Sequence, residues 1–325
     1  MNVSALEWFI TLGVTIAVLI FDVVVVARRP HEPTKRECAI YLAIYIGLAI
    51  AFGAWVWLSH GPQFGLEFFA GWLTEYSLSV DNLFLFLLIM ASFSVPKKNQ
   101  QEALLVGIVL ALVFRGIFIA LGAVAINQFS WVFYIFGAFL IFTAIQLGRD
   151  TDHDDDADNF VVRFARSHLS FTDKWEGLKL WLKEDGKRVM TPMFLVIVAL
   201  GTTDIIFALD SIPAIYGLTS EPYLVFTANV FALMGLRQLY FLLGDFLKRL
   251  VYLSYGLAFI LGFIGVKLLL HALHENKVPF LNGGKGFDVP EIPTLVSLGV
   301  IVVTLVVTTV ASLLKTRKTS REDAP

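Results

Sequence analysis

Residues 193–217 read MFLVIVALGTTDIIFALDSIPAIYG, an apolar stretch that contains two carboxylates. A helix that crosses a bilayer needs about 20 predominantly apolar residues, and this stretch has that length. A charged side chain at the centre of such a helix costs about 2.5 to 3.5 kcal/mol on insertion scales, so acids there are rare and usually functional. The stretch therefore predicts a membrane-spanning helix in which Asp204 and Asp210 belong to a functional site.

The rest of the chain is equally apolar. Hydrophobic residues make up 57% of the 325 residues and charged residues only 16%, and the mean hydropathy is +0.74. A soluble core of this size needs far less apolar surface. We expect an all-α, polytopic membrane helix bundle of about nine spans, forming one domain over residues 1–325. The predicted spans are residues 8–26, 39–58, 67–92, 103–126, 130–148, 193–217, 223–244, 252–272 and 294–314.

Positive charges alternate along the chain between the predicted spans. Almost all lysines and arginines outside the spans fall in segments that share one side, and only Lys277 and Lys285 fall on the other. The positive-inside rule then places the N-terminus outside and the C-terminus in the cytoplasm. Residues 149–190 become a cytoplasmic loop and residues 315–325 a cytoplasmic tail. The net charge of −2 gives no basic field that would bind nucleic acid.

The predicted cytoplasmic loop has two distinct parts. It opens with residues 150–158, DTDHDDDAD, whose carboxylates either collect metal cations or form a solvated linker. Their spacing lacks the glycine and the final glutamate of an EF-hand loop. The amphipathic stretch 160–182 follows and carries Trp175 and Trp181, a pattern that predicts helices lying along the cytoplasmic face of the membrane.

An internal repeat relates the two acidic spans. Residues 74–82, TEYSLSVDN, align without a gap on residues 203–211, TDIIFALDS, and the two acids are six residues apart in both. The next span of each half contains one buried arginine, Arg115 or Arg237. Each unit has three spans, so the second enters the membrane from the opposite side, as in transporters built from inverted repeats. The predicted units are residues 67–148 and 193–272.

The predicted spans contain more acidic than basic side chains. Arg115, Arg237 and Lys267 are natural partners for the acids, yet they leave a negative excess. A bound divalent cation would balance it. Ion pairs that hold helices together, or carboxylates kept protonated by burial, would also account for the acids. The intramembrane acids are Glu75, Asp81, Asp204 and Asp210.

Helix geometry constrains how these acids could hold one ion. Residues six apart on an ideal helix differ by about 120° in direction and about 9 Å along the axis, so one ion cannot reach both. Polar and small residues in the two motifs would allow local unwinding that turns backbone carbonyls toward the cavity, namely Ser77, Ser79, Asn82, Gly201, Thr202, Ser211 and Pro213. We expect Asp81 and Asp210 to be the innermost ligands, and Glu75 and Asp204 to be further ligands or proton-linked partners. The predicted metal-site residues are Glu75, Asp81, Asn82, Asp204, Asp210 and Ser211.

The ligand types select a class of metal. Cys38 is the only cysteine, so a thiolate cage for zinc is excluded. Carboxylate and amide oxygens favour Mn²⁺, Mg²⁺ or Ca²⁺, carried as substrate rather than held as a cofactor. Asp22, near the cytoplasmic end of the first span, is either an interfacial ion-pair partner or an exit ligand for the cation. Asn229 and Thr143 fit a cavity lining or hydrogen bonds between helices equally well.

The two acidic motifs, together with residues 134–140, YIFGAFL, resemble the TerC family of bacterial membrane proteins, close to its Alx-type members. The similarity covers essentially all nine spans. It implies membership in the LysE-like transporter superfamily, a bacterial inner or plasma membrane, and a role in manganese export and metal homeostasis; the family's older name comes from tellurium resistance. It also implies that the ion site comprises Glu75, Asp81, Asn82, Asp204, Asp210 and Ser211.

Two function classes follow. The first is a secondary transporter that exports a divalent cation, with Mn²⁺ indicated by the resemblance alone. The second is a non-transporting membrane component of a metal or tellurium stress-resistance complex. An intramembrane aspartyl enzyme is disfavoured, because the chain lacks the Gly-x-Gly-Asp motif of such proteases. We expect no enzymatic activity.

Overall fold

The computed structural model describes most of the chain. The described residues are 1, 3–28, 34–129, 131–149, 171–184, 187–247, 250–274, 276, 281–282 and 285–322. Within these ranges some side chains lie outside the description, namely those of Leu19, 22–28, Asp81, Phe84, Lys98, Asn127, Glu184, Lys187, 243–247 and 317–322.

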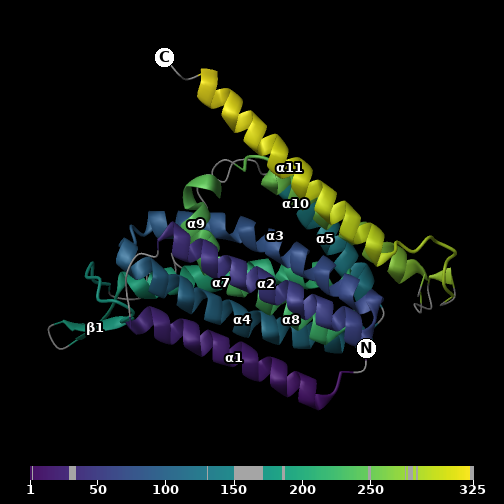
Figure 1. The fold of residues 1–325 in the computed structure, drawn as a ribbon, viewed down its shortest axis with the longest axis horizontal. Coiled ribbons are helices and arrows are strands. Elements are labelled where there is room, and N and C mark those ends of the chain that lie inside the picture. Colours follow the sequence, from purple (N-terminus) through teal and green to yellow (C-terminus); the bar gives the residue numbers. More distant parts are fainter. Residues whose placement is uncertain are drawn as a thin grey trace.

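Helices dominate the described residues, as predicted for a polytopic membrane bundle (Figure 1). Eight segments of the described chain are helices long and apolar enough to cross a membrane, with α8 and α9 counted as one, and the N-terminal helix is apolar over Ala5–Val18. All nine predicted spans coincide with helices. The helices are α1 (Ala5–Arg28), α2 (Lys35–His60), α3 (Pro62–Ser92), α4 (Lys97–Gln128), α5 (Val132–Arg149), α7 (Pro192–Tyr216), α8 (Pro222–Met234), α9 (Leu236–Leu247), α10 (Leu253–His274) and α11 (Thr294–Glu322).

Helix starts follow local sequence signals. Pro62, Pro192 and Pro222 each stand in the first turn of a helix, where the missing N–H costs nothing. Thr34 caps α2 in a capping box with Glu37. These signals determine the residues at which α2, α3, α7 and α8 begin.

The local unwinding that the sequence would allow at the acidic motifs does not occur. Helices α3 and α7 run without a break through both motifs. Ser77 and Thr202 donate their hydroxyl hydrogens to carbonyls one turn back in their own helices, at 2.6 Å and 2.7 Å, so these residues are satisfied without unwinding. The interruption lies instead in the seventh span, at Gly235 between α8 and α9.

The central helices pair in a pattern that suits the predicted repeat. Helix α3 packs against α8, α4 against α7, and α5 against α10, while α1 and α11 flank the bundle (Figure 1). The first predicted unit contains α3, α4 and α5, and the second contains α7, the α8–α9 span and α10. If each helix is replaced by its counterpart in the other unit, the α3–α8 pair becomes the α7–α4 pair and the α5–α10 pair stays the same. The inverted repeat itself stays a prediction.

Helices α5 and α10 cross closely at two glycines. A Cβ added to Gly137 would lie 2.9 Å from the Gly265 carbonyl oxygen, and one added to Gly265 would lie 2.9 Å from the Gly137 oxygen. No side chain fits at either position without a backbone shift. This contact joins the last helices of the two predicted units.

The described part of the loop before α7 departs from the sequence prediction. Residues 171–182 contain no helix; instead β1 (Trp181–Glu184) pairs antiparallel with β2 (Lys187–Met190), and Leu182 faces Val189 in the register. The sequence places Asp185 and Gly186 between the strands, a pair typical of two-residue hairpin loops, and this signal outweighs the amphipathic pattern. Residues 150–158 and 160–170 lie outside the described residues.

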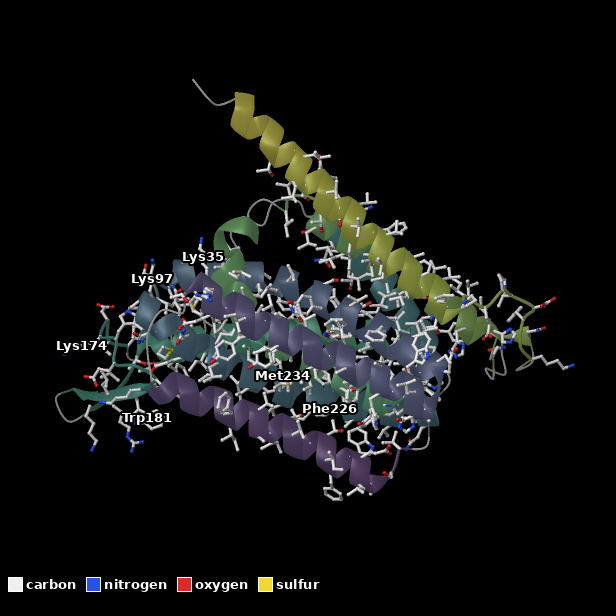
Figure 2. All side chains as sticks on the ribbon, viewed as in Figure 1. Lys35, Lys97, Lys174, Trp181, Phe226 and Met234 are labelled. Carbon is white, nitrogen blue, oxygen red and sulfur yellow. The ribbon has the colours of Figure 1, made fainter. Side chains whose placement is uncertain are left out.

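Basic side chains gather at one end of the bundle. Lys35, Lys97 and Lys174 lie there together with Trp181 and the hairpin, as Figure 2 shows. This end contains the first turn of α4 and α7 and the last turn of α3. The grouping agrees with the charge alternation in the sequence; the side of the membrane on which it lies stays a prediction.

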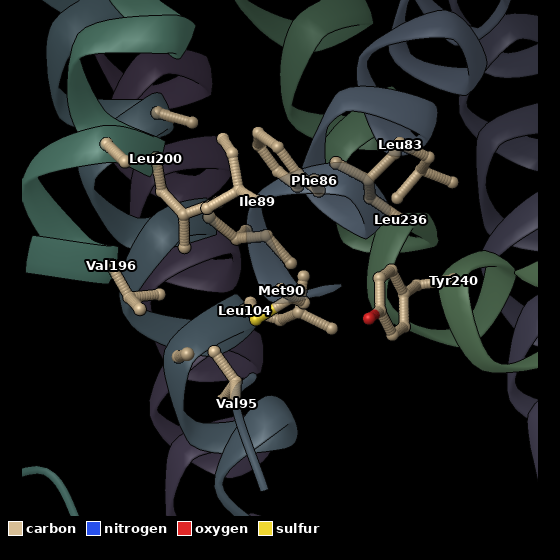
Figure 3. Close-up of a cluster of buried hydrophobic side chains, with 14 of the residues drawn as sticks. Leu83, Phe86, Ile89, Met90, Val95, Leu104, Val196, Leu200, Leu236 and Tyr240 are labelled. Atoms are coloured by element: carbon tan, nitrogen blue, oxygen red, sulfur yellow. The ribbon is translucent and has the colours of Figure 1, made fainter. Parts of the chain in front are cut away.

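Two of the apolar clusters in the described residues lie on either side of the middle of the bundle. The cluster near the basic end, called here the lysine-end cluster, includes Leu83, Phe86, Met90, Leu104, Val196, Leu200, Leu236 and Tyr240 (Figure 3). The cluster at the opposite end, the far-end cluster, includes Val56, Phe68, Trp72, Ile119, Ile212, Ile215, Tyr223 and Leu224. Both contain residues of α3, α4, α7 and the α8–α9 span, and the far-end cluster also contains residues of α2.

Candidate metal centre

Four buried polar side chains, called here the charge layer, lie between these clusters. They are Glu75 on α3, Arg115 on α4, Asp204 on α7 and Asn229 on α8. Arg115 and Glu75 have no exposed surface, and Asp204 and Asn229 are 2% and 1% exposed. Each charged residue falls where its helix passes from one apolar cluster to the other, as Arg115 does between Ala111 and Ile119. The layer is therefore sealed from both ends of the bundle.

Arg115 connects the layer across four helices. Its Nη1 donates to Glu75 Oε2 and also to Asn229 Oδ1, the latter at 2.9 Å. Its Nη2 lies 3.6 Å from Asp204 Oδ1, an ion pair that is too long for a hydrogen bond. Asn229 Nδ2 donates in turn to the Val225 carbonyl at 3.2 Å, which fixes the amide oxygen toward the arginine. One guanidinium thus neutralises part of the charge of two carboxylates.

Several oxygens around this layer have no hydrogen-bond partner among the described residues. They are Glu75 Oε1 and Asp204 Oδ2 on the carboxylates, and the hydroxyls of Ser79 and Ser211. The Ser211 hydroxyl faces the Glu75 carboxylate without reaching hydrogen-bond geometry. Buried polar atoms are normally paired, so unsatisfied oxygens from α3 and α7 call for an explanation. Oxygen atoms of this kind are the ligands that hard cations prefer.

Asp210 points away from the charge layer. Its Oδ1 accepts a hydrogen bond from Thr143 on α5 at 3.1 Å, whereas Asp204 faces α4. This divergence matches the 120° separation expected on a regular helix.

Two other predicted ligands, Asn82 and Ser211, are buried, at 5% and 1% exposure. The side chain of Asp81 lies outside the described residues.

The remaining predicted residues occupy other places. Arg237 is 9% exposed on α9, and its Nη2 donates a hydrogen bond at 3.1 Å to the side-chain oxygen of Gln238. Lys267 lines a polar cavity of about 550 Å³ at the far end, together with Glu67 and Glu291, rather than the charge layer. The Asp22 side chain is not among those described. Among the described side chains, no three acids, histidines or cysteines form a metal-binding group.

Asn229 and Thr143 form the hydrogen bonds between helices that the sequence left open. Neither carries a charge, and neither belongs to the aligned motifs, so composition alone gave no reason to prefer them. A polar residue at the depth of a charged one, on a neighbouring span, is the signal that identifies such partners.

Comparison with known proteins identifies the family. The model of the integral membrane protein TerC family matches residues 60–320. This chain belongs to the TerC family. It is accordingly a multi-pass integral membrane protein, and the predicted family is confirmed. No solved structure matches the chain.

Curated relatives of this TerC family member come from several bacteria. An uncharacterized membrane protein of Mycobacterium tuberculosis (strain CDC 1551 / Oshkosh) is 48% identical over 317 residues, which cover 96% of this chain and 80% of that protein. An uncharacterized membrane protein of Myxococcus xanthus is 36% identical, covering 98% and 96%. The Alx protein of Escherichia coli (strain K12), named as a candidate membrane-bound redox modulator, is 37% identical, covering 91% of each chain.

Proposed function

We propose that this TerC family protein is a secondary transporter that carries a divalent cation, most specifically Mn²⁺, out of the cytoplasm across a bacterial plasma membrane. The observation that carries the proposal is the charge layer. Two fully or nearly fully buried carboxylates lie at mid-depth between two apolar clusters. A transporter that works by alternating access passes through an occluded conformation, in which the substrate site is closed from both ends.

Charge balance supports a cation as the substrate. Within the charge layer, two acidic side chains face one guanidinium, and Asp210 adds a third acid whose described partner is a neutral hydroxyl. Each buried acid costs about 2.5 to 3.5 kcal/mol on insertion scales, so an uncompensated charge needs a partner. A divalent cation between α3 and α7 would supply it.

The donor set supports the class of metal. The unpartnered oxygens at the charge layer belong to carboxylate and hydroxyl groups, and oxygen ligands of this kind bind hard cations in preference to Cu⁺ or Zn²⁺. Mn²⁺, Mg²⁺ and Ca²⁺ all suit this chemistry, and the family resemblance favours Mn²⁺. Glu75, Asp81, Asn82, Asp204, Asp210 and Ser211 remain the proposed ligands and proton-linked partners.

The name of the Escherichia coli relative suggests a redox role. The present chain has one cysteine, Cys38, so it cannot form an intrachain disulfide. A redox effect that arises from altered cellular metal content would be compatible with transport.

Manganese content of cells tests the proposal. In a manganese-sensitive bacterial strain, expression of the wild type should lower cellular Mn²⁺ and restore growth, and Asp204→Asn or Asp210→Asn should not. Asp288→Asn, in an exposed segment before α11, is the matched control and should behave as the wild type. Equal Mn²⁺ content with and without the protein would refute transport and favour a non-transporting stress component.

A further inference from the structure

The polar cavity at the far end of the bundle is separate from the charge layer. Its volume of about 550 Å³ is that of a ligand pocket, and Glu67 on α3, Lys267 on α10 and Glu291 before α11 line it. Helices α3 and α11 begin beside this cavity, and α7 and α10 end there, at the end of the bundle opposite the hairpin (Figure 1). The cavity therefore lies at the level where a membrane-spanning bundle meets the lipid headgroups.

Lys267 is a cation without a partner among the described residues. It lies about two turns before α10 ends at His274, and it forms no hydrogen bond or ion pair with any described side chain. An unpaired ammonium group in a spanning helix is costly. Glu67, by contrast, has a partner at each oxygen: Oε2 accepts from the Thr219 hydroxyl at 2.6 Å and Oε1 from the Gln63 amide at 2.8 Å.

The cavity offers both signs of charge to a ligand. Glu67 and Glu291 attract Lys267 through space but form no ion pair with it. Glu291 Oε1 lies 3.4 Å from His271 Nδ1. Each carboxylate oxygen can accept more than one hydrogen bond, so both acids can still receive N–H donors from a ligand. A complementary ligand carries an anionic group for Lys267 and an ammonium group for the two acids.

The surroundings of the cavity favour a lipid as the source of this zwitterion. Thr294 lines the cavity as the first residue of α11, and the next two residues, Leu295 and Val296, are 63% and 50% exposed. Exposed apolar side chains beside a polar site are typical of a surface that contacts the membrane. A phosphoethanolamine headgroup carries a phosphate and a primary ammonium a short distance apart, and its acyl chains would continue along this apolar surface.

We propose that the far-end cavity binds a membrane lipid with a phosphoethanolamine headgroup, whose phosphate pairs with Lys267 and whose ammonium donates to Glu67 and Glu291. The lipid supplies an ion-pair partner for Lys267 and joins α3 to α10 and to the segment before α11. A ligand that binds only the folded protein also stabilises it. The inference is independent of the proposed transport, because these three residues lie outside the charge layer and the predicted metal site.

The test is the thermal unfolding temperature of the purified full-length protein in detergent, after removal of co-purified lipid. Added phosphatidylethanolamine should raise this temperature by about 2 to 4 °C. Phosphatidylcholine, whose quaternary ammonium has no N–H to donate, and phosphatidylglycerol, which has no ammonium, should raise it less. Lys267→Gln should lose the shift. Lys285→Gln replaces an exposed lysine at the same end that does not line the cavity, and as the matched control it should keep the shift.

Each other outcome would overturn the inference. An equal shift in Lys267→Gln and the wild type would exclude Lys267 from the site, and an equal shift from phosphatidylcholine or phosphatidylglycerol would exclude recognition of the ammonium. Glycerophosphoethanolamine, the headgroup without acyl chains, separates the two sources: a shift as large as that from the lipid would identify a dissolved ligand instead. Without lipid, Lys267→Gln should unfold no lower than the wild type, so a variant that does not fold would assign Lys267 a structural role and contradict the proposal.

Discussion

The Arg115 guanidinium on α4 donates a hydrogen bond to the Glu75 carboxylate on α3, and neither side chain has any exposed surface. Asp204, which the repeat alignment matches to Glu75, reaches the same guanidinium from α7. One base therefore serves the two acids that the alignment pairs. The charge layer lies where the two predicted repeat units meet, so a change in their relative position would change its charge balance.

Removal of the Glu75 charge should destabilise the protein. Glu75→Gln leaves the buried guanidinium with one carboxylate, Asp204, at the longer distance, and with the neutral Asn229. Loss of one partner of a buried pair typically costs about 3 to 5 kcal/mol. Thermal unfolding of the purified protein in detergent measures the effect. Asp288→Asn should unfold like the wild type.

The triple variant Glu75→Gln/Asp204→Asn/Arg115→Gln separates charge from packing. It removes both carboxylates together with the guanidinium that they share, and we expect it to be more stable than Glu75→Gln alone. A triple variant less stable than the single one would show that these charges do not account for the loss.

Sequence alone predicted the nine spans and the buried acids, because apolar length and the rarity of intramembrane charge are local signals. It did not predict that Arg115 joins Glu75 to Asp204, since this depends on how α3, α4 and α7 pack. The unbroken helices at the acidic motifs were missed for a related reason: Ser77 and Thr202 bond carbonyls in their own helices, which their residue types do not reveal. The hairpin before α7 was missed although Asp185-Gly186 indicates it.

The glycine contact between α5 and α10 should not tolerate a side chain. Gly137→Ala places a Cβ 2.9 Å from a backbone oxygen, so the helices must separate, at a cost of about 1 to 3 kcal/mol. Thermal unfolding reports the loss. Gly47→Ala on α2 meets no atom within 4 Å and should be neutral or slightly stabilising. Equal stabilities of the two variants would argue against close packing at Gly137.

Thr143 should assist Asp210 in transport, but transport should not depend on it entirely. Thr143→Val keeps the shape of the side chain but loses its hydrogen bond to the carboxylate, an interaction worth about 1.5 to 3 kcal/mol when one partner is charged. We expect a several-fold slower Mn²⁺ flux rather than a complete loss. Thr304→Val is the matched control, because the Thr304 hydroxyl bonds only to the Val300 carbonyl of its own helix. Identical fluxes in the two variants would show that Thr143 does not contribute to the site.

Cysteine labelling tests the predicted orientation. In a Cys38→Ser background, a cysteine replacing Lys174, at the basic end, should react with an impermeant thiol reagent only after the cells are opened (Figure 2). A cysteine replacing Asp288, in the exposed segment before α11, should react in intact cells. The reverse pattern would invert the topology and the inferred direction of transport.

Flux through the purified protein tests the central claim most directly. Proteoliposomes that contain a Mn²⁺-sensitive dye measure this flux in the absence of any other protein. The flux is measured with and without an imposed proton gradient, and with Mg²⁺ or Ca²⁺ as competitor. We predict Mn²⁺ movement by the wild type and by Asp288→Asn, and none above empty liposomes by Asp204→Asn or Asp210→Asn. No flux by folded wild-type protein, or full flux by both aspartate variants, would contradict the account.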